Sequence, residues 1–359
     1  MKSYVNRLVA VGNFLRNAKT IVRQESYFPE EKHKSFFQMF LDYLEYVYKY
    51  GQEPKFYFVY GLDCAASNKR EYMPYPQFLR LRQQTNIVRI GNQTRYSYVC
   101  LLRDKGLFEL IAREWKIPTP KIDGVLLGGA VFCDSERIEI EDYLRGLPDG
   151  TSLFIKEKSG VKGSGAYSLD KKANVYYLNE KEVSLESISG EVPDDTEYII
   201  QKRLSQHSDM SKLYPHALNT LRVVSVIHKG EVVILGSLLR IGANGSQVDN
   251  WAHGGVAVGI NKDGTHMKWG LYKPGYGTKT DKHPNTSVTF EGFQLPFWNE
   301  TICLVNDTHK KLSRIPTVGW DIAITETGPI IIEGNDDYDG ALLQACTGGK
   351  KKEFLKYYQ

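Results

Sequence analysis

The stretch Gly319-Trp-Asp-Ile-Ala-Ile-Thr-Glu-Thr-Gly-Pro-Ile-Ile-Ile-Glu-Gly-Asn335 predicts a β-hairpin. Two runs rich in β-branched residues flank a Thr-Gly-Pro segment that begins at Thr327, and this pattern is typical of antiparallel strands joined by a tight turn. Asp321 and Glu333 are each six residues from Thr327, so a symmetric hairpin places them opposite each other. Glu333 and Asn335 are two residues apart and share one face of their strand. Three oxygen-bearing side chains are therefore predicted to converge.

The predicted hairpin brings two carboxylates together. Directly opposite side chains on an antiparallel pair lie about 5 Å apart at Cβ, and like charges in that arrangement are destabilising. A cation would relieve the repulsion, and hard oxygen donors beside an amide suit Mg²⁺ that carries a substrate phosphate. The hairpin alone does not distinguish such a metal site from an ordinary solvated sheet edge.

The composition is that of an ordinary globular protein. The chain has 359 residues, of which 42% are hydrophobic and 25% are charged, which allows two or three domains with a substantial core. The net charge of +4 comes from 46 basic and 42 acidic residues. So mild a balance gives no strong case for nucleic acid as a partner, although local basic patches remain possible.

The cysteines and the apolar segments bear on the compartment. Five cysteines, at positions 64, 100, 133, 303 and 346, are odd in number and far apart, and no CxxC or Cys/His zinc spacing appears. A disulfide framework or a zinc site is therefore not expected, and we expect a protein of the reducing cytoplasm. The N-terminus lacks the apolar run of a signal peptide, and no stretch is long enough for a membrane span. A basic amphipathic helix over residues 3–23 could contact a membrane surface or pack on the protein's own core.

Apolar periodicity predicts an α+β architecture. Residues 1–52 are expected to be helical, and Lys55–Tyr60 is expected to form a short strand. Further on, the patterns predict helices over 103–116, 300–312 and 340–346, strands over 124–132, 153–158 and 198–202, and a hairpin of 221–227 with 232–239. Antiparallel hairpins interleaved with single helices indicate an α+β or mixed fold.

A strand that runs into a glycine-rich loop is a candidate phosphate site. Its sequence is Phe154-Ile-Lys-Glu-Lys-Ser-Gly-Val-Lys-Gly-Ser-Gly165. The glycines let the backbone approach a ligand and offer N–H groups to phosphate oxygens, and Lys156 just before the loop can add a point charge. Because Gly165 is followed by Ala-Tyr, the loop is not a Walker A motif, and it is not a dinucleotide fingerprint either. A flexible surface loop with solvated lysines is the alternative.

Two further strand segments carry polar residues suited to a ligand. The end of the apolar strand Tyr198–Leu204 could offer main-chain hydrogen bonds to an adenine edge, although most strands look similar. Arg222 and Arg240, on the two arms of the hairpin after residue 220, suit a carboxylate or a phosphoryl group. A two-residue turn would place Arg222 opposite Ser237 and put Arg240 on the other face. Either a bulge intervenes or one arginine is structural.

The polar loop Val248–Gly255, which ends in a double glycine, could hold a substrate or a second metal ligand. Asn250 is its best candidate, whereas His253 is either a loop hydrogen-bonder or a base. The segment after Asn335 has a superficial likeness to a calcium loop, but Cys346 stands where an EF-hand has Glu, which rejects that motif. Asp339 is predicted to be the N-cap of the last helix.

In order along the chain, these segments resemble the ATP-grasp superfamily. Asp104-Lys105 followed by Ile117-Pro-Thr-Pro120 resembles the helix that opens that fold, and the glycine loop, Gln201–Leu204 and the Asp321–Asn335 hairpin follow at suitable separations. The resemblance covers roughly residues 100–345. The amino-acid sequence as a whole is most similar to the sugar-transfer-associated ATP-grasp group, which is linked to the synthesis of surface polysaccharides.

The resemblance implies an α+β, ATP-grasp fold in which two lobes clasp ATP, preceded by a mainly helical N-terminal region. Residues 1–100 would form that region, a candidate for acceptor binding. Residues 101–200 would form the lid with the glycine-rich loop, and residues 201–359 the C-terminal lobe with the metal site.

The resemblance also implies roles for individual residues. Those implied to bind ATP are Lys105, Lys156, Gly163, Ser164, Gly165, Gln201, Lys202, Arg203, Leu204 and Asp209, the last as a ribose ligand. Those implied to bind two Mg²⁺ ions are Asp321, Glu333 and Asn335. Those implied to act in catalysis are Arg222 and Arg240, and those implied to bind substrate are Asn250, His253, Gly254 and Gly255. Many members of the superfamily carry Glu where this chain has Gln201 or Lys202.

The implied function is an ATP-dependent, ADP-forming carboxylate–amine ligase that acts through an acylphosphate. The carboxylate would belong to a small molecule or a glycan, and the amine to an amino acid, in the synthesis of surface polysaccharides. Two alternatives stay open at this point: a kinase of a small molecule or sugar, and a non-catalytic nucleotide-binding component of a glycan assembly complex.

Overall fold

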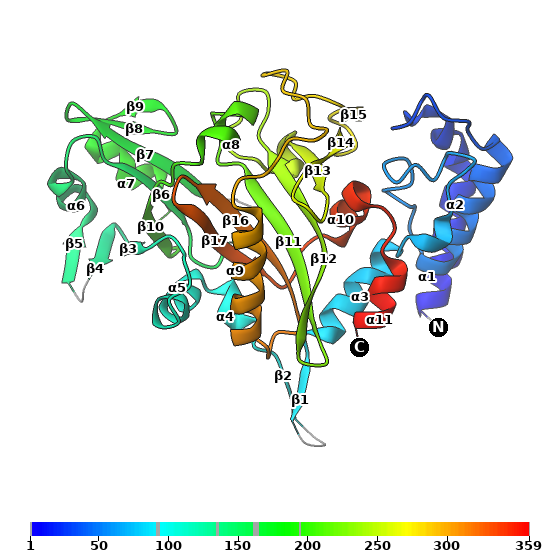
Figure 1. Ribbon diagram of the computed structural model, residues 1–359, viewed down its shortest axis with the longest axis horizontal. Coiled ribbons are helices and arrows are strands. Elements are labelled where there is room, and N and C mark those ends of the chain that lie inside the picture. The colour runs from blue at the N-terminus through cyan, green and yellow to red at the C-terminus, as the bar shows by residue number, and fades with distance from the viewer. Residues whose placement is uncertain (1, 91–93, 134–135, 161–164, 194, 359) are drawn as a thin grey trace.

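Figure 1 shows the computed structural model, which describes residues 2–90, 94–133, 136–160, 165–193 and 195–358. Two antiparallel sheets lie side by side, and a helical N-terminal region lies at the far end of the second sheet. The helices and antiparallel strands confirm the predicted α+β class. No helix in the described part of the chain is long and apolar enough to cross a membrane.

The N-terminal region is helical, as predicted. Its helices are α1 (Lys2–Asn17), η1 (Ala18–Arg23), α2 (Phe36–Tyr50), η2 (Lys69–Glu71) and α3 (Tyr75–Thr85). Ser35 begins α2 through a capping box with Gln38, and Gly51 ends α2 in the left-handed conformation. A short hairpin of β1 (Val88–Ile90) and β2 (Thr94–Tyr96) follows, and then α4 (Cys100–Arg103) and α5 (Lys105–Glu114).

The strand predicted over Lys55–Tyr60 is wrong, because the segment forms a run of turns. The amide of Tyr57 donates to the carbonyl of Pro54, which is turn geometry. The apolar side chains are nevertheless buried, and the ring of Tyr57 packs edge-on against Tyr43 of α2 at 5.0 Å between centroids. Burial against a helix thus accounts for the apolar run without a strand ladder.

Residues 122–202 build an eight-stranded sheet in the order β5-β4-β3-β10-β6-β7-β8-β9. Its strands are β3 (Ile122–Leu127), β4 (Ala130–Cys133), β5 (Glu136–Glu139), β6 (Ser152–Glu157), β7 (Ala166–Lys172), β8 (Val175–Leu178), β9 (Lys181–Val183) and β10 (Tyr198–Lys202). Helices α6 (Ile140–Gly146) and α7 (Leu185–Glu191) close one apolar cluster with this sheet. The single strand predicted over 124–132 is a hairpin, because Gly128 and Gly129 both adopt positive φ and turn the chain.

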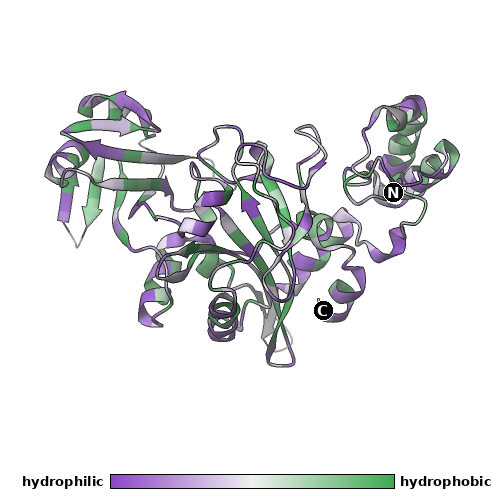
Figure 2. Ribbon diagram, turned by 45° about the horizontal axis from the view of Figure 1, so that its top comes forward, coloured by the Kyte–Doolittle hydropathy of each residue, from purple (hydrophilic) through white to green (hydrophobic). Residues whose placement is uncertain are grey.

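A seven-stranded sheet in the order β15-β14-β13-β12-β11-β16-β17 forms the centre of the molecule. Its strands are β11 (Thr220–His228), β12 (Glu231–Ile241), β13 (Val256–Ile260), β14 (His266–Leu271), β15 (Lys279–Thr280), β16 (Thr317–Thr325) and β17 (Gly328–Asn335). Figure 2 shows that apolar residues run along these strands, as expected for a sheet covered on both faces. The predicted hairpins of β11 with β12 and of β16 with β17 are confirmed.

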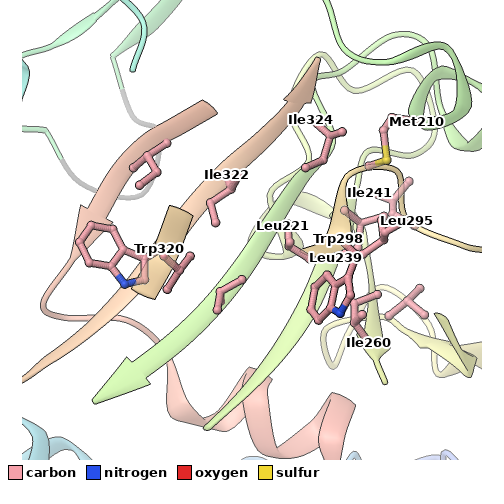
Figure 3. Packing of buried hydrophobic residues seen from close by; sticks show 14 of the residues in the cluster. Met210, Leu221, Leu239, Ile241, Ile260, Leu295, Trp298, Trp320, Ile322 and Ile324 are labelled. Carbon is pink, nitrogen blue, oxygen red and sulfur yellow. The ribbon is translucent and has the colours of Figure 1, made fainter. Parts of the chain in front are cut away.

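Separate apolar clusters lie on the two faces of this sheet. One contains Leu221, Leu239, Trp320 and Ile322 and is closed by α9 (Trp298–Lys311), as Figure 3 shows in part. The other packs α10 (Gly340–Thr347), α11 (Lys351–Tyr357) and the N-terminal region against the opposite face. The N-terminal region therefore shares its core with the seven-stranded sheet.

The two segments that flank the eight-stranded sheet in the chain both contact the β16–β17 hairpin. The amide of Ile331 donates to the carbonyl of Pro118 at 2.9 Å, before the eight-stranded sheet begins. The amide of His207 donates to the carbonyl of Ile324 at 2.8 Å, after that sheet ends and just before α8 (Ser208–Leu213). The hairpin that carries the predicted metal ligands is thus the part of the central sheet to which the eight-stranded sheet is attached.

Candidate active site

The hairpin of β16 and β17 pairs Asp321 with Glu333, as predicted. Its turn lies between Thr325 and Gly328, and is therefore centred slightly before Thr327. A β-bulge between Asp321 and the next residue compensates for this offset. Without the bulge the register would slip by one residue, and Glu333 would not lie opposite Asp321.

Asn335 links the two carboxylates. Its amide nitrogen donates to Glu333 Oε1 at 3.1 Å and to Asp321 Oδ2 at 3.3 Å. Asp321 is buried, whereas Glu333 and Asn335 are half-buried. The three side chains that the sequence predicted to converge therefore do converge.

Arg222 and Arg240 lie on the same face of the sheet. A bulge after Val224 places Arg222 opposite Leu238, so that Arg240, two residues further along β12, has its side chain on the same side. Of the two explanations that the sequence left open, the bulge is the correct one.

Both arginines bind Asp321. Arg222 donates from Nε and Nη2 to the two carboxylate oxygens at 2.5 and 2.9 Å, and Arg240 Nη2 lies 3.1 Å from Oδ2. Burial raises the pKa of Asp321, but the charges of Arg222 and then Arg240 outweigh burial and hold the pKa at about 2. Asp321 is therefore ionised at neutral pH.

Asp249 belongs to the same network, although no motif in the sequence predicts it. Its Oδ2 accepts hydrogen bonds from the amide of Thr220 at 2.9 Å and from the Thr220 hydroxyl, and lies 3.6 Å from Arg240 Nε. Arg240 also donates to Thr220 Oγ1. The sequence places Asp249 in a polar loop beside Asn250, and only the fold brings it to Arg240, so no local pattern indicates this role.

Lys156 brings a positive charge towards these carboxylates from the eight-stranded sheet. It lies on β6, paired with β10, and is 9% exposed. Burial lowers its pKa to about 8 against the charge of Glu333, while Lys105 and Asp321 act in opposite directions. None of the hydrogen bonds between described residues uses its ammonium group. Because burial disfavours the charged form of this side chain, a nearby anion would stabilise it, and the lysine is suited to bind one.

Lys105 is the second lysine near Glu333. It is the first residue of α5, and Asp104 caps that helix by accepting hydrogen bonds from two amides of its first turn. The ammonium group of Lys105 donates to the carbonyl of Gly160 at 2.8 Å, at the start of the glycine-rich loop. Burial lowers the pKa of Lys105, and Glu333 opposes this effect. Lys105 and Lys156 thus lie in the field of the same carboxylate.

The ends of the glycine-rich loop fold around the carboxylate of Glu157. A Cβ atom at Gly160 or at Gly165 would clash with that side chain, and Gly165 also has a φ of +65°. Gly163 and Ser164, which were predicted to bind ATP, lie outside the described residues. The close approach of Glu157 therefore favours glycine at position 160, and the positive φ favours it at position 165, in addition to any ligand.

Gln201–Leu204 lies where β10 leaves the eight-stranded sheet. Gln201 is buried and donates from Nε2 to the carbonyl of Pro120 at 3.0 Å, which links β10 to the segment before β3. Lys202 is exposed, and the guanidinium of Arg203 lies 3.6 Å from Asp170. The main chain of this segment, more than its side chains, is therefore the part suited to contact a base.

Asp209, the candidate ribose ligand, lies in the first turn of α8. Its carboxylate pairs with Lys212 at 2.6 Å and lies 3.7 Å from His207. The structure thus gives Asp209 local partners that a ribose hydroxyl would have to share.

The loop Val248–Gly255 adjoins the acidic cluster through Asp249, but its candidate residues have structural roles of their own. Asn250 caps the short 3-10 helix η3 (Trp251–His253), since its side chain accepts a hydrogen bond from the amide of Ala252 at 3.2 Å. His253 is exposed. A Cβ atom at Gly255 would lie 2.7 Å from the carbonyl oxygen of Asp249, and Gly254 has a φ of +89° beside the ring of Tyr276, so both glycines allow close packing.

The prediction that Asp339 caps the last helix is half right. Its side chain accepts a hydrogen bond from the amide of Ala341 at 2.7 Å at the start of α10, but α11 follows as a further helix.

The donor set of the hairpin fits a hard cation best at Glu333. Both oxygens of Asp321 already accept hydrogen bonds from arginine, whereas Glu333 makes no ion pair with a described residue. A 180° rotation of the Asn335 amide would place its oxygen beside the two carboxylates. Oxygen donors without sulfur or imidazole are the ligands that suit Mg²⁺.

Most of the chain is similar to known proteins. The model of a family described as sugar-transfer associated ATP-grasp matches residues 84–352, which include the whole cluster around Asp321. No curated protein matches the chain.

Similar solved structures include D-alanyl-alanine synthetase A from Vibrio cholerae O1 biovar eltor str. N16961, with 12% identity over 71% of this chain and 63% of that chain and a TM-score of 0.41. A D-alanine–D-alanine ligase from Bacillus anthracis has 15% identity over 72% of this chain and 64% of that chain, with a TM-score of 0.37. The ADP complex of PurK, an N5-carboxyaminoimidazole ribonucleotide synthetase, has 10% identity over 68% of this chain and 47% of that chain, with a TM-score of 0.38. The chain thus spans less than two thirds of each of these proteins, and identities this low concern the fold alone.

Proposed function

The chain belongs to the sugar-transfer-associated ATP-grasp family and has the ATP-grasp fold, and from that premise we propose that it is an ADP-forming carboxylate–amine ligase. In the proposed reaction a carboxylate oxygen attacks the γ-phosphorus of ATP, ADP leaves, and an acylphosphate forms. An amine then attacks the acyl carbon, loses a proton and displaces inorganic phosphate. The observation that supports this proposal most directly is that Glu333, which is paired with Asp321 on the hairpin, acts electrostatically on both Lys105 and Lys156.

The two lysines are proposed to bind the phosphates of ATP. Lys156 is buried without a hydrogen-bonding partner among the described residues, and a phosphate oxygen would supply one. Lys105 holds the carbonyl of Gly160 and can therefore couple the position of the glycine-rich loop to that of the phosphates. The backbone amides of the loop, from Gly163 to Gly165, are proposed to complete the phosphate site.

Glu333, Asn335 and Asp321 are proposed to hold two Mg²⁺ ions, which when bound neutralise charge on the transferring phosphoryl group. Glu333 supplies the carboxylate that is not ion-paired with a described residue. Asp321 contributes mainly by holding Arg222 and Arg240 in place, because its oxygens already accept hydrogen bonds from both.

The two arginines are proposed to act in the second step. Arg222 binds Asp321 through Nε and Nη2, and Arg240 uses the same two nitrogens within the network. Neither Nη1 has a hydrogen-bond partner among the described residues, so each remains to donate. A fixed donor aimed at the developing oxyanion lowers the barrier to amine attack. Asp249 and Thr220 would act as positioning residues, since they hold Arg240.

Contacts with adenine, ribose and the substrates are also proposed. The main chain of Gln201–Leu204 would contact adenine, and Asp209 would contact the ribose. The loop residues Asn250, His253, Gly254 and Gly255 would bind substrate beside Arg240, to which they are joined through Asp249. Residues 1–100 share a core with the central sheet and are proposed to help bind the acceptor.

The substrate class rests on the association of the family with sugar transfer. We propose that the carboxylate belongs to a uronic acid in a glycan, that the amine is an amino acid, and that the product is part of a surface polysaccharide.

The test is turnover of ATP against a panel of uronic acids and amino acids, with ADP and AMP measured separately. The proposal expects ADP, and in the presence of carboxylate and hydroxylamine it expects a trapped hydroxamate. A phosphorylated acceptor without any hydroxamate would identify a kinase instead. If ATP is not turned over with any of the acceptors, the result would favour a non-catalytic nucleotide-binding protein.

A further inference from the structure

Two segments of the N-terminal region are paired through their backbones at a distance from the acidic cluster. Hydrogen bonds of 2.8 and 2.7 Å join residues 32–34 to residues 63–65, and His33 and Cys64 form an isolated antiparallel bridge. Side chains directly opposite each other on such a pair lie on the same side. The imidazole of His33 therefore faces the thiol of Cys64.

Asp63 completes a group of three donors. One donor atom each from His33, Asp63 and Cys64 lies within 4.8 Å of the other two, and His33 Nδ1 lies 3.2 Å from Asp63 Oδ2. Asp63 and Cys64 are buried, whereas His33 remains partly exposed, so that the group has access from solvent.

The buried carboxylate of Asp63 is the strongest indication that this group binds a ligand. It is 1% exposed, and neither carboxylate oxygen accepts a hydrogen bond from a described residue. Burial of a carboxylate without partners is strongly unfavourable. By contrast, Asp42 in the same region is surrounded by Lys34, Lys69 and Tyr57, which all bond to it. The region thus satisfies the half-buried Asp42 with three hydrogen bonds, whereas the buried Asp63 has, in the described part of the chain, only the imidazole of His33 beside it.

A protonated His33 would satisfy the site only in part. Its Nδ1 can donate to one oxygen of Asp63, which leaves the second oxygen without a donor. A metal ion would use the carboxylate, the imidazole and the thiolate of Cys64 together.

We propose that His33, Asp63 and Cys64 bind a transition-metal dication of the Zn²⁺ class. Sulfur and imidazole nitrogen beside a carboxylate are the ligands of Zn²⁺ and Co²⁺, whereas Mg²⁺ and Ca²⁺ take oxygen donors. The 3.2 Å between His33 Nδ1 and Asp63 Oδ2 already matches two neighbouring ligands of a tetrahedral zinc ion, and the separations from Cys64, which are within 4.8 Å, would close by up to about 1 Å through side-chain rotation. The fourth position is left to water. The ion would fasten residues 32–34 to residues 63–65.

The ligands are thirty residues apart in the chain, which explains why no zinc spacing appears in the sequence. The site is separate from the ATP site and does not depend on the proposed ligase activity.

The test is titration of the full-length protein with Co²⁺, followed by absorption spectroscopy. Wild type is expected to bind Co²⁺ stoichiometrically with a thiolate-to-cobalt charge-transfer band, and Zn²⁺ should displace it. Cys64→Ser should lose the band, whereas the matched control Cys303→Ser, at an exposed cysteine of α9, should keep it. Glu333→Gln should also keep it, which separates this site from the Mg²⁺ site.

His33→Asn provides a second variant at a partly exposed position, where folding is not at risk. Its affinity for Co²⁺ is expected to fall at least about tenfold with an unchanged far-ultraviolet circular dichroism spectrum. A charge-transfer band that persists in Cys64→Ser, an unchanged affinity in His33→Asn, or the absence of saturable binding by wild type would each overturn the proposal.

Discussion

Replacement of Lys156 by Met is expected to stabilise the protein while it abolishes ATP binding. Burial lowers the pKa of Lys156 from 10.5 to about 8, and one pKa unit corresponds to about 1.4 kcal/mol, so the buried charge costs about 3 kcal/mol at pH 7. Met has a similar length without the charge, and the variant should recover up to about 3 kcal/mol of unfolding free energy. A buried lysine that lowers the unfolding free energy in this way is expected at a position where it binds a ligand.

The pH dependence of the unfolding free energy provides a second test of the buried charge on Lys156. Between pH 8 and 10.5 the unfolded chain holds a proton on Lys156 that the folded chain has lost, so wild-type stability rises with pH across this window. The advantage of Lys156→Met should therefore be largest below pH 8 and should vanish above pH 10.5.

The assay is urea unfolding of the nucleotide-free protein at pH 7 and at higher pH, together with calorimetric titration of ATP. Lys158→Met is the matched control, because that ammonium group is paired with Glu197 at 3.1 Å and lies 3.6 Å from Asp104. The control should gain no stability. A Lys156→Met protein that is less stable than wild type would show that the buried charge does not destabilise the fold, and one that binds ATP as wild type does would show that Lys156 is not a phosphate ligand.

Substitutions at the acidic residues should separate metal binding from folding. Glu333→Gln is expected to abolish Mg²⁺-dependent turnover of ATP at an unchanged melting temperature, and near-wild-type activity would remove Glu333 from the metal site. Asp321→Asn should instead lower the unfolding free energy by about 3 kcal/mol, because Arg222 and Arg240 lose their shared carboxylate, and a loss below about 0.5 kcal/mol in urea would contradict this network. Calorimetry should show ATP affinity falling about tenfold from pH 7 to 9 in wild type, since the pKa of Lys156 is about 8, but not in Lys156→Arg. Equal pH dependence in both proteins would exclude Lys156 as a phosphate ligand.

The parts of the site that could be predicted from sequence are those that local geometry determines. Asp321, Glu333 and Asn335 lie on one hairpin, whose turn residues and two-residue alternation indicate which side chains meet. Even there the predicted pairing depends on a bulge, which corrects a turn centred slightly before its expected position.

The parts that could not be predicted depend on contacts between distant segments. The bulge after Val224 decides that Arg222 and Arg240 share a face, and no residue type near it identifies it in advance. Asp249 reaches Arg240 only once the loop after β12 has folded back. The apolar run Lys55–Tyr60 has the composition of a strand, but it packs against α2, and tertiary contacts override that propensity.

The most direct test of the proposed ligase chemistry is the fate of an acceptor carboxylate labelled with ¹⁸O during complete turnover with Mg²⁺, ATP and amine. An acylphosphate mechanism transfers one carboxylate oxygen to phosphorus, so ¹⁸O is expected in the released inorganic phosphate together with ADP. Unlabelled phosphate, or label retained in a phosphorylated acceptor, would contradict it.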